Sequence, residues 1–183
     1  MNYKTYSGDA FVIGRRNFKE ADRILILFTR DFGKISLIAK GVRKLTSRKR
    51  GGIEVFNKIK FFAVKGKNLD ILTEVQMMNG FDEVRINLRR MSVGYYFCEV
   101  ISRTTQEAEK HPELFEILEK YFNKLETSRN LKKLRLDFVK EVLVAIGFWP
   151  GGTEMINPDK ILESVTERKM NSSRVGKKML QQE

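Results

Sequence analysis

The chain has 183 residues, and its 35 Lys and Arg against 23 Asp and Glu give a formal net charge of +12. A hydrophobic content of 42% with only three prolines excludes an intrinsically disordered, collagen-like or proline-rich chain. The longest apolar run, Ile24–Phe28, is far shorter than the roughly 20 residues of a membrane-spanning helix, and the single Cys98 excludes an internal disulfide framework and a multi-thiolate zinc site.

The first 80 residues show the patterning of short strands separated by glycine-containing turns. The expected strands are Phe11–Ile13 with its extension to Arg16, Ile24–Phe28, Ile35–Ala39, Lys58–Val64 and Leu69–Met78. In the last of these, alternation predicts that Ile71, Thr73, Val75 and Met77 share one face. Five short strands in this length indicate a small closed or partly open barrel, with residues 40–52 as the long connection between the third and fourth strands.

From Phe81 the apolar spacing changes to three and four residues, which is typical of amphipathic helices. Val84, Leu88, Met91, Tyr95 and Cys98 form one such stripe, in which Cys98 is expected to be a small buried hydrophobe. A second helix is expected to start at His111-Pro112 and to bury Leu114, Leu118, Tyr121 and Leu125.

A third helix is predicted from the stripe Leu131, Leu134, Phe138 and Val142, widened by Leu136, Val139, Leu143 and Ile146. Gly147 is placed to end this helix. One short helix is predicted over residues 158–165, docking through Ile161, Leu162 and Val165. The predicted organisation is therefore α+β, with a barrel domain at 1–80, a helical domain at 81–166 and a polar, frayed tail at 167–183.

The positive charge is concentrated in the barrel region. Residues 1–80 carry 17 Lys and Arg against 7 Asp and Glu, a net charge of +10, whereas 81–150 and 151–183 each carry +1. The 22 residues from Phe32 to Ile53 contain no acid. The basic residues of this span are Lys34, Lys40, Arg43, Lys44, Arg48, Lys49 and Arg50. Such a run is either a solvated face or a surface for a polyanion, and its length favours the polyanion.

Sequence signatures of catalysis are absent. The chain has no phosphate-binding glycine loop, no nucleophile elbow and no zinc-protease motif, and His111 is its only histidine. Glu20 and Asp22 resemble a carboxylate pair, but a turn before the second strand explains them without chemistry. We therefore expect no catalytic residue, no metal site and no cofactor, and we interpret the protein as a non-enzymatic binding protein.

A basic, strand-built domain carrying Phe32, Phe56, Phe61 and Phe62 suits single-stranded nucleic acid, because cations contact phosphates and exposed rings stack on bases. Most of these rings are expected in the core, with about one of the four exposed. Two alternatives remain open. One is an adaptor that acts through protein contacts with an acidic partner tail, and the other is an RNA-binding module.

Three motifs between Gly8 and Phe56 resemble the bacterial recombination mediator RecO. They are Gly14–Arg23 (GRRNFKEADR), Leu27–Lys34 (LFTRDFGK) and Ala39–Lys44 (AKGVRK), followed by Ser47 and Gly51–Phe56 (GGIEVF). The order and spacing of E-A-D-R, T-R-x-x-G-K and A-K-G-V-R carry the likeness. The pattern continues through the helices to Gly147–Pro150 (GFWP), which covers about four-fifths of the chain.

The resemblance implies an N-terminal OB-fold, a five-stranded barrel, followed by an α-helical domain. It also implies binding of single- and double-stranded DNA, annealing of complementary strands, and help in loading RecA onto DNA coated by single-strand-binding protein, together with RecR. The implied setting is the cytoplasm at the nucleoid, with no membrane. The implied DNA-binding surface carries over to the following residues: Arg15, Arg16, Lys34, Lys40, Arg43, Lys44, Arg48, Lys49 and Arg50.

The sequence departs from the family pattern after Pro150. Many RecO proteins continue with a four-cysteine zinc module, whereas here Gly151-Gly152-Thr153-Glu154 follows and residues 151–183 contain no cysteine. The expectation is a short form without zinc. It is then an open question whether this chain makes the partner contacts that other members make through their C-terminal portion.

Replacing Arg43, Lys44 and Arg48 by alanine is expected to weaken single-stranded DNA binding and to flatten its salt dependence. For each phosphate that the variant no longer binds, the slope of log K against log salt should fall by about 0.7, because fewer condensed counterions are released. Equilibrium titrations at several salt concentrations measure this slope. A slope equal to that of the unmodified protein removes the segment from the binding surface.

Overall fold

The computed structural model describes residues 4–153, 155–166, 170 and 172. It divides into two compact units, one formed by residues 1–80 with 105–112 and the other by residues 81–104 with 113–183. The predicted tail 167–183 lies outside the described residues except at Met170 and Ser172. Within the described part of the chain, no helix is long and apolar enough to cross a membrane.

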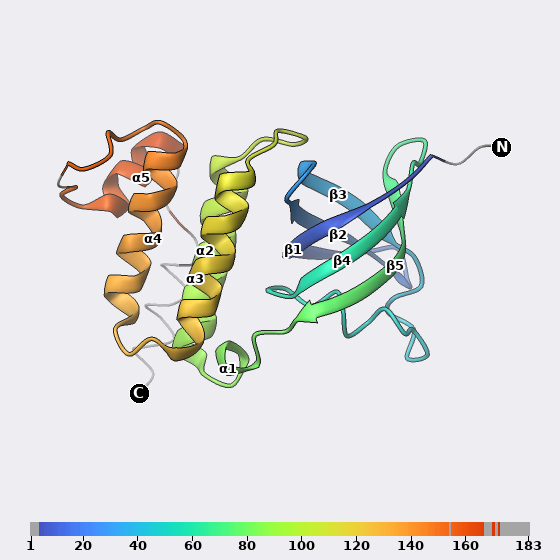
Figure 1. Ribbon diagram of the computed structural model, residues 1–183. Coiled ribbons are helices and arrows are strands. Elements are labelled where there is room, and N and C mark those ends of the chain that lie inside the picture. Colours follow the sequence, from blue (N-terminus) through green and yellow to red (C-terminus); the bar gives the residue numbers. More distant parts are fainter. Residues whose placement is uncertain (1–3, 154, 167–169, 171, 173–183) are drawn as a thin grey trace. The chain divides into compact units, whose positions relative to one another are not determined.

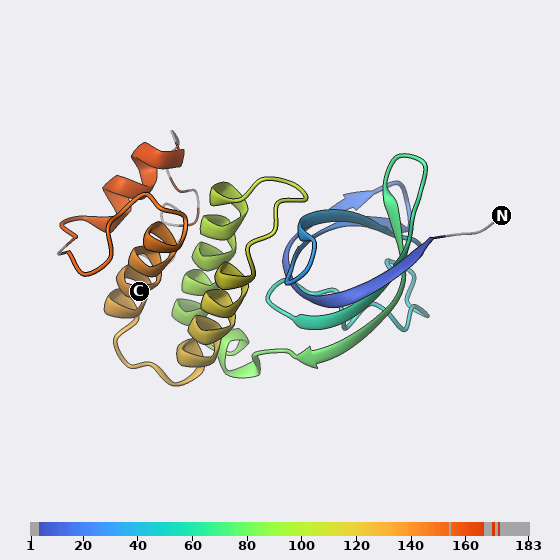
Figure 2. The ribbon, with the colours of Figure 1, turned by 45° about the horizontal axis from the view of Figure 1, so that its top comes forward.

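The first unit is a closed barrel of five strands (Figure 1, Figure 2). The strands are β1 (Thr5–Phe18), β2 (Asp22–Thr29), β3 (Gly33–Ala39), β4 (Lys58–Val64) and β5 (Asp70–Asn79). Their order around the barrel is β1-β2-β3-β5-β4, with antiparallel pairing throughout except for the short parallel contact between β3 and β5. The predicted OB-type barrel followed by helices is confirmed.

The long strand β1 closes the barrel because it pairs with two neighbours. Residues 5–11 pair with β4, and residues 10–18 pair with β2. A β-bulge at Ile13 interrupts the second pairing, since Val12 lies opposite Leu27 and Gly14 opposite Ile26. The bulge shifts the alternation of side chains by one residue. Ala10 and Val12 face the barrel core before it, and Arg15 and Asn17 continue that inner side after it.

A second bulge changes the predicted face of β5. Ala63 lies opposite Leu72 and Phe62 opposite Glu74, so Thr73 is the extra residue in the ladder. Leu72 is fully buried in the barrel core, whereas Thr73 and Met77 are exposed. The predicted single face of Ile71, Thr73, Val75 and Met77 is therefore wrong, because strict alternation does not survive a bulge.

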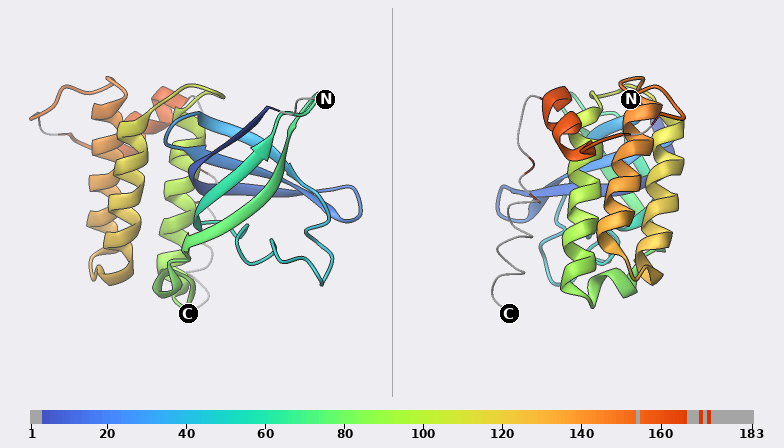
Figure 3. Two further views of the ribbon diagram at one scale, coloured as in Figure 1. Left: turned by 45° about the vertical axis from the view of Figure 1, so that its right-hand side comes forward. Right: turned by 90° about the vertical axis from the view of Figure 1, so that its left-hand side faces the viewer.

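The second unit contains five helices among its described residues (Figure 3). They are α1 (Asp82–Arg85), α2 (Leu88–Thr104), α3 (Pro112–Thr127), α4 (Leu131–Ala145) and α5 (Pro158–Thr166). Four aromatic rings hold α2, α3 and α4 together. Phe97 of α2 packs on Phe138 of α4 with ring centroids 4.2 Å apart, and Tyr121 and Phe122 of α3 lie 6.0 and 5.8 Å from Phe97.

The buried face of α2 differs from the predicted stripe. Gly94, Phe97, Cys98 and Ile101 are buried, whereas Leu88 and Tyr95 are 52% and 47% exposed. The predicted stripe runs across a break between two helices. Helix α1 ends at Arg85, and the side chain of Asn87 caps α2 by accepting a hydrogen bond from the Arg90 N–H at 3.1 Å. The burial of Cys98 is confirmed, as is the inward face predicted for α3.

Gly147 ends α4 as predicted. Its φ of 76° is in the left-handed region, which a residue without a Cβ adopts without strain. The Phe148 N–H then donates to the Leu143 carbonyl at 2.9 Å, a bond that satisfies one of the last free carbonyls of the helix.

Phe61 on β4 is fully buried and touches the rings of Tyr6 and Phe32, at centroid distances of 5.8 and 6.4 Å. Phe61→Ala is therefore expected to lower the free energy of unfolding by about 3–5 kcal/mol. The neighbouring Phe62→Ala, on the partly exposed side of the same strand, is the matched control and should cost clearly less. Urea unfolding followed by circular dichroism compares them, and equal losses would contradict this assignment of the core.

Candidate nucleic-acid interface

The predicted basic segment is an ordered connection between β3 and β4, running from residue 40 to residue 57 (Figure 1). Val42 and Ile53 anchor it, because both side chains are fully buried in the barrel core. Asn57 adds a polar anchor by donating to the carbonyls of Gly51 and Gly52 at 2.8 and 3.1 Å. The chain between these anchors is therefore held on the barrel surface in a defined conformation.

The start of the connection is tied to the turn between β1 and β2. The Gly41 N–H donates to the Asp22 carboxylate at 2.8 Å, and the Arg43 N–H donates to the Ala21 carbonyl at 3.0 Å. The Arg43 guanidinium also donates to the Lys19 carbonyl at 3.2 Å. Asp22 therefore has a structural partner, and two basic segments that are distant in sequence meet here.

Seven of the nine predicted DNA-binding residues have exposed side chains. These are Arg15, Arg16, Lys40, Arg43, Lys44, Arg48 and Arg50. Within the part of the chain that the structure describes, only Arg15 of these seven makes an ion pair with a carboxylate. Arg43 also donates to the Lys19 carbonyl, and the other five present their charge to solvent, as a surface for a polyanion requires.

The remaining two, Lys34 and Lys49, are partly buried and bind backbone carbonyls. The Lys34 ammonium donates to the Thr105 carbonyl at 2.5 Å, and burial lowers its pKa, although Glu107 opposes this effect. The Lys49 ammonium donates to the carbonyls of Leu72 and Thr73, at 3.2 and 3.3 Å, where β5 has its bulge. Both cations stabilise the barrel and are less available to phosphate than the seven exposed ones.

Lys34 belongs to a contact that the sequence did not indicate. The Ala108 N–H donates to the Lys34 carbonyl at 2.9 Å, and Ser36 on β3 donates to the Glu107 carboxylate at 3.0 Å. The segment 105–112 therefore lies along β3. Gly33 is required for this approach, because a Cβ there would come within 1.9 Å of the Glu109 carbonyl oxygen.

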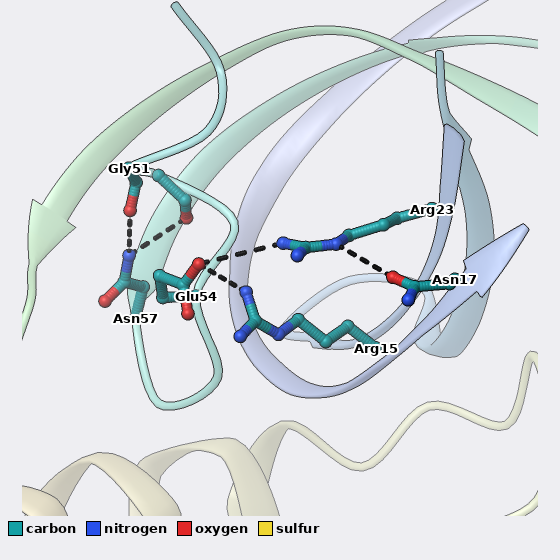
Figure 4. A network of polar contacts seen from close by, with 7 residues as sticks. Arg15, Asn17, Arg23, Gly51, Glu54 and Asn57 are labelled. Atoms are coloured by element: carbon teal, nitrogen blue, oxygen red, sulfur yellow. Dashed lines mark hydrogen bonds and ion pairs between the residues drawn. The ribbon is translucent and has the colours of Figure 1, made fainter. Parts of the chain in front are cut away.

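Two arginines converge on one carboxylate at the end of the barrel (Figure 4). Arg15 on β1 donates a hydrogen bond to Glu54, and the same oxygen, Oε1, lies 3.7 Å from Nη1 of Arg23 on β2. Arg23 also donates to Asn17 at 3.4 Å through Nε. Glu54 is the first acid after the acid-free span, and from the β3–β4 connection its side chain points toward the arginines of β1 and β2.

Arg23 was not among the predicted binding residues, although it belongs to the same E-A-D-R motif. Burial lowers the pKa of its guanidinium, and the positive charges of Arg15, Arg43 and Arg50 lower it further, while Glu54 raises it. Each of these three arginines is therefore near enough to repel Arg23. Arg23 lies opposite Asn17, two residues from Arg15 on the same side, through the pairing of β1 with β2, which the sequence pattern did not predict.

None of the four phenylalanines considered for base stacking is exposed. Phe56 and Phe61 are buried in the barrel unit, and Phe32 and Phe62 are partly buried. The expectation that about one ring is exposed is therefore wrong. The large apolar side chain that does project from the connection is Leu45, which is 88% exposed.

The described residues contain no group of three His, Cys, Asp or Glu side chains that could hold a metal ion. The chemistry that this surface supports is the binding of negatively charged oxygens by guanidinium and ammonium groups.

Comparison with known proteins gives two adjacent family matches. Residues 1–81 match the family described as Recombination protein O N terminal, and residues 85–156 match the one described as Recombination protein O C terminal. Together they include the barrel, the basic connection and helices α2, α3 and α4.

Curated relatives with the name DNA repair protein RecO are similar to this chain. The protein from Desulfitobacterium hafniense is 38% identical over 110 residues, covering 60% of this chain and 40% of the relative. Those from Desulforudis audaxviator and a Roseiflexus species are both 29% identical, over 147 and 168 residues, covering 80% and 92% of this chain. The chain spans 59% of the length of each of these two relatives.

Substitution of the carbonyl-bound lysines is expected to affect stability more than anion binding. Lys49→Met should lower the free energy of unfolding by about 1 kcal/mol, since it removes hydrogen bonds to two carbonyls, and should leave the salt slope of DNA binding unchanged. Lys40→Met, at an exposed position, is the matched control and should reduce the slope by about 0.7 at unchanged stability. Salt titrations and urea unfolding measure the two effects. A reduced slope for Lys49→Met with reduced stability for Lys40→Met would contradict the assignment of Lys49 to stability and Lys40 to phosphate binding.

Proposed function

The chain belongs to the recombination protein O family, and on this basis we propose that it binds DNA through the phosphate backbone at the β3–β4 connection and the adjoining part of β1. We extend the proposal to a non-enzymatic role. The protein would anneal complementary strands and assist RecA loading in recombinational DNA repair, acting at the nucleoid with RecR and single-strand-binding protein.

One observation carries the proposal. The connection is anchored at Val42, Ile53 and Asn57, yet it directs Lys44, Arg48 and Arg50 to solvent. Surface cations that lack carboxylate partners are available to phosphate without first breaking an ion pair. Because the anchors hold the backbone in place, little conformational entropy is lost when DNA binds.

The strength of such binding follows from counterion release. Arg16, Lys40, Lys44, Arg48 and Arg50 are exposed and lack ion pairs among the described residues. Five phosphate contacts on a single strand would give a salt slope of about −3.5, which is roughly a hundredfold loss of affinity between 50 and 200 mM salt. Such contacts read no base sequence, as suits a protein that pairs strands of any sequence.

The same physics supplies a mechanism for annealing. Two DNA strands repel each other through their phosphates, and this repulsion slows the first encounter of complementary bases. A protein surface that neutralises phosphates of one strand lowers the repulsion felt by the second. Binding of a single strand and acceleration of annealing should therefore depend on the same side chains.

Competition separates this proposal from its alternatives. A labelled single-stranded oligonucleotide is titrated with the protein and then displaced with unlabelled DNA, RNA or an acidic peptide. Displacement by DNA at the lowest concentration supports the proposal. Stronger displacement by the peptide would favour an adaptor for an acidic protein tail, and stronger displacement by RNA would favour an RNA-binding module.

Annealing provides the functional test. Fluorescence energy transfer between complementary strands is followed with the unmodified protein, with Arg43/Lys44/Arg48→Ala, and with Lys4/Lys60/Lys67→Ala, which removes three exposed positive charges elsewhere on the barrel. The first variant should slow annealing much more than the control. Equal rates for the two variants would show that net charge alone matters and would contradict the proposed surface.

A further inference from the structure

We infer that Arg15 and Arg23, with the neighbouring arginines of the β3–β4 connection, form a binding site for a single backbone phosphate of DNA, and that the Glu54 carboxylate occupies this site until DNA displaces it. The inference rests on the proposed function and deepens it. It adds Arg23 to the binding residues and gives Glu54 the role of a built-in competitor.

The strand register creates the site. Asn17 on β1 lies opposite Arg23 on β2, and Arg15 is two residues from Asn17, so all three side chains share one side of the hairpin. Diagonal neighbours across an antiparallel pair are within reach of long side chains. The two guanidinium groups can therefore converge on one anion, as Figure 4 shows for the Glu54 carboxylate.

Glu54 satisfies this pair of arginines incompletely. A single oxygen, Oε1, serves both guanidinium groups, and its distance of 3.7 Å to Nη1 of Arg23 is too long for a hydrogen bond. That nitrogen is buried and has no hydrogen-bond partner among the described residues. A phosphodiester shares its negative charge between two non-bridging oxygens and, unlike the tethered Glu54 side chain, can orient them so that each guanidinium has an acceptor of its own.

The charge balance also favours a second anion. Arg15 and Arg23 share one carboxylate, and Arg43 and Arg50 are near enough to Arg23 for their charges to lower its pKa, so positive charge exceeds negative charge around Arg23. An excess of positive charge is costly in the DNA-free protein, because the guanidinium groups repel one another. A phosphate that enters the cluster relieves this repulsion.

Exchange of the carboxylate for a phosphate requires little energy. The Glu54 side chain is 36% exposed, and ion pairs at such exposure contribute little to stability. The carboxylate can therefore rotate toward water when a phosphate replaces it. If it stayed in place it would repel the phosphate, so the charge of Glu54 opposes DNA binding in either event.

Glu54→Gln tests this role, because it removes the charge and keeps the shape of the side chain. The matched control is Glu74→Gln on β5, where the exposed carboxylate makes no ion pair among the described residues. Both variants change the net charge equally. Affinity for a labelled single-stranded oligothymidylate is measured at several salt concentrations.

Glu54→Gln is expected to bind about fivefold more tightly at 0.1 M salt, since no carboxylate has to be displaced. Its salt slope should equal that of the unmodified protein, because the same phosphate is bound in both. Glu74→Gln should leave the affinity nearly unchanged. The gain should disappear when Glu54→Gln is combined with Arg15→Gln. Arg23→Lys, which keeps the charge but loses the planar fork, should also reduce the gain.

Thermal unfolding distinguishes a role of Glu54 in DNA binding from a purely structural role. Without DNA, Glu54→Gln should melt at a lower temperature than the unmodified protein, because its arginines lack a counter-charge. Saturating oligonucleotide should raise its melting temperature by more than that of the unmodified protein, in proportion to the tighter binding.

Two failures are distinguishable. If the unmodified protein binds DNA, Arg43/Lys44/Arg48→Ala flattens the salt slope, and Glu54→Gln behaves like Glu74→Gln, then Glu54 is a structural ion-pair partner and this inference is wrong while the proposed function stands. If the unmodified protein shows no salt-dependent DNA binding, the proposed function fails and this inference fails with it.

Discussion

The pairing of β1 with two neighbouring strands is the constraint that makes the barrel possible. Its first half pairs with β4 and its second half with β2, so one continuous strand closes the sheet. Closure leaves the central residues of β1 facing the apolar core. Toward its C-terminal end the same strand runs past the core, and its inner side there carries polar residues, Arg15 and Asn17.

The cationic surface is built on apolar anchors. Val42 and Ile53 are buried residues on either side of the mostly exposed stretch 43–52, and each fixes one side of the basic segment to the core. The stability that these anchors supply offsets the repulsion between the basic side chains, so that a run of charges becomes a defined surface. Phenylalanines of the barrel unit pack against other rings, as Phe32 does against Tyr6, with ring centroids 5.2 Å apart. The arrangement therefore favours recognition of phosphates over recognition of bases.

Local periodicity and composition were enough to predict several features of the chain. Alternation located β4 at its observed bounds, the three- and four-residue spacing located α3 with its buried face, and Gly147 marked the end of α4. The concentration of charge in residues 1–80 pointed to the basic connection, and the E-A-D-R and A-K-G-V-R motifs pointed to the family. In each case the signal lies within a few residues of the feature.

The availability of each basic side chain depends instead on contacts made in the folded chain. The bulge at Ile13 places Arg15, and not Arg16, beside Glu54, and a bulge of one residue has no signature in an alternating pattern. Lys34 binds a carbonyl 71 residues along the chain, and Lys49 binds one 23 residues along it. Arg23 on β2 likewise meets Glu54 of the β3–β4 connection only in the folded chain. These outcomes depend on which segments meet in space, and periodicity carries no information about contacts so distant along the chain.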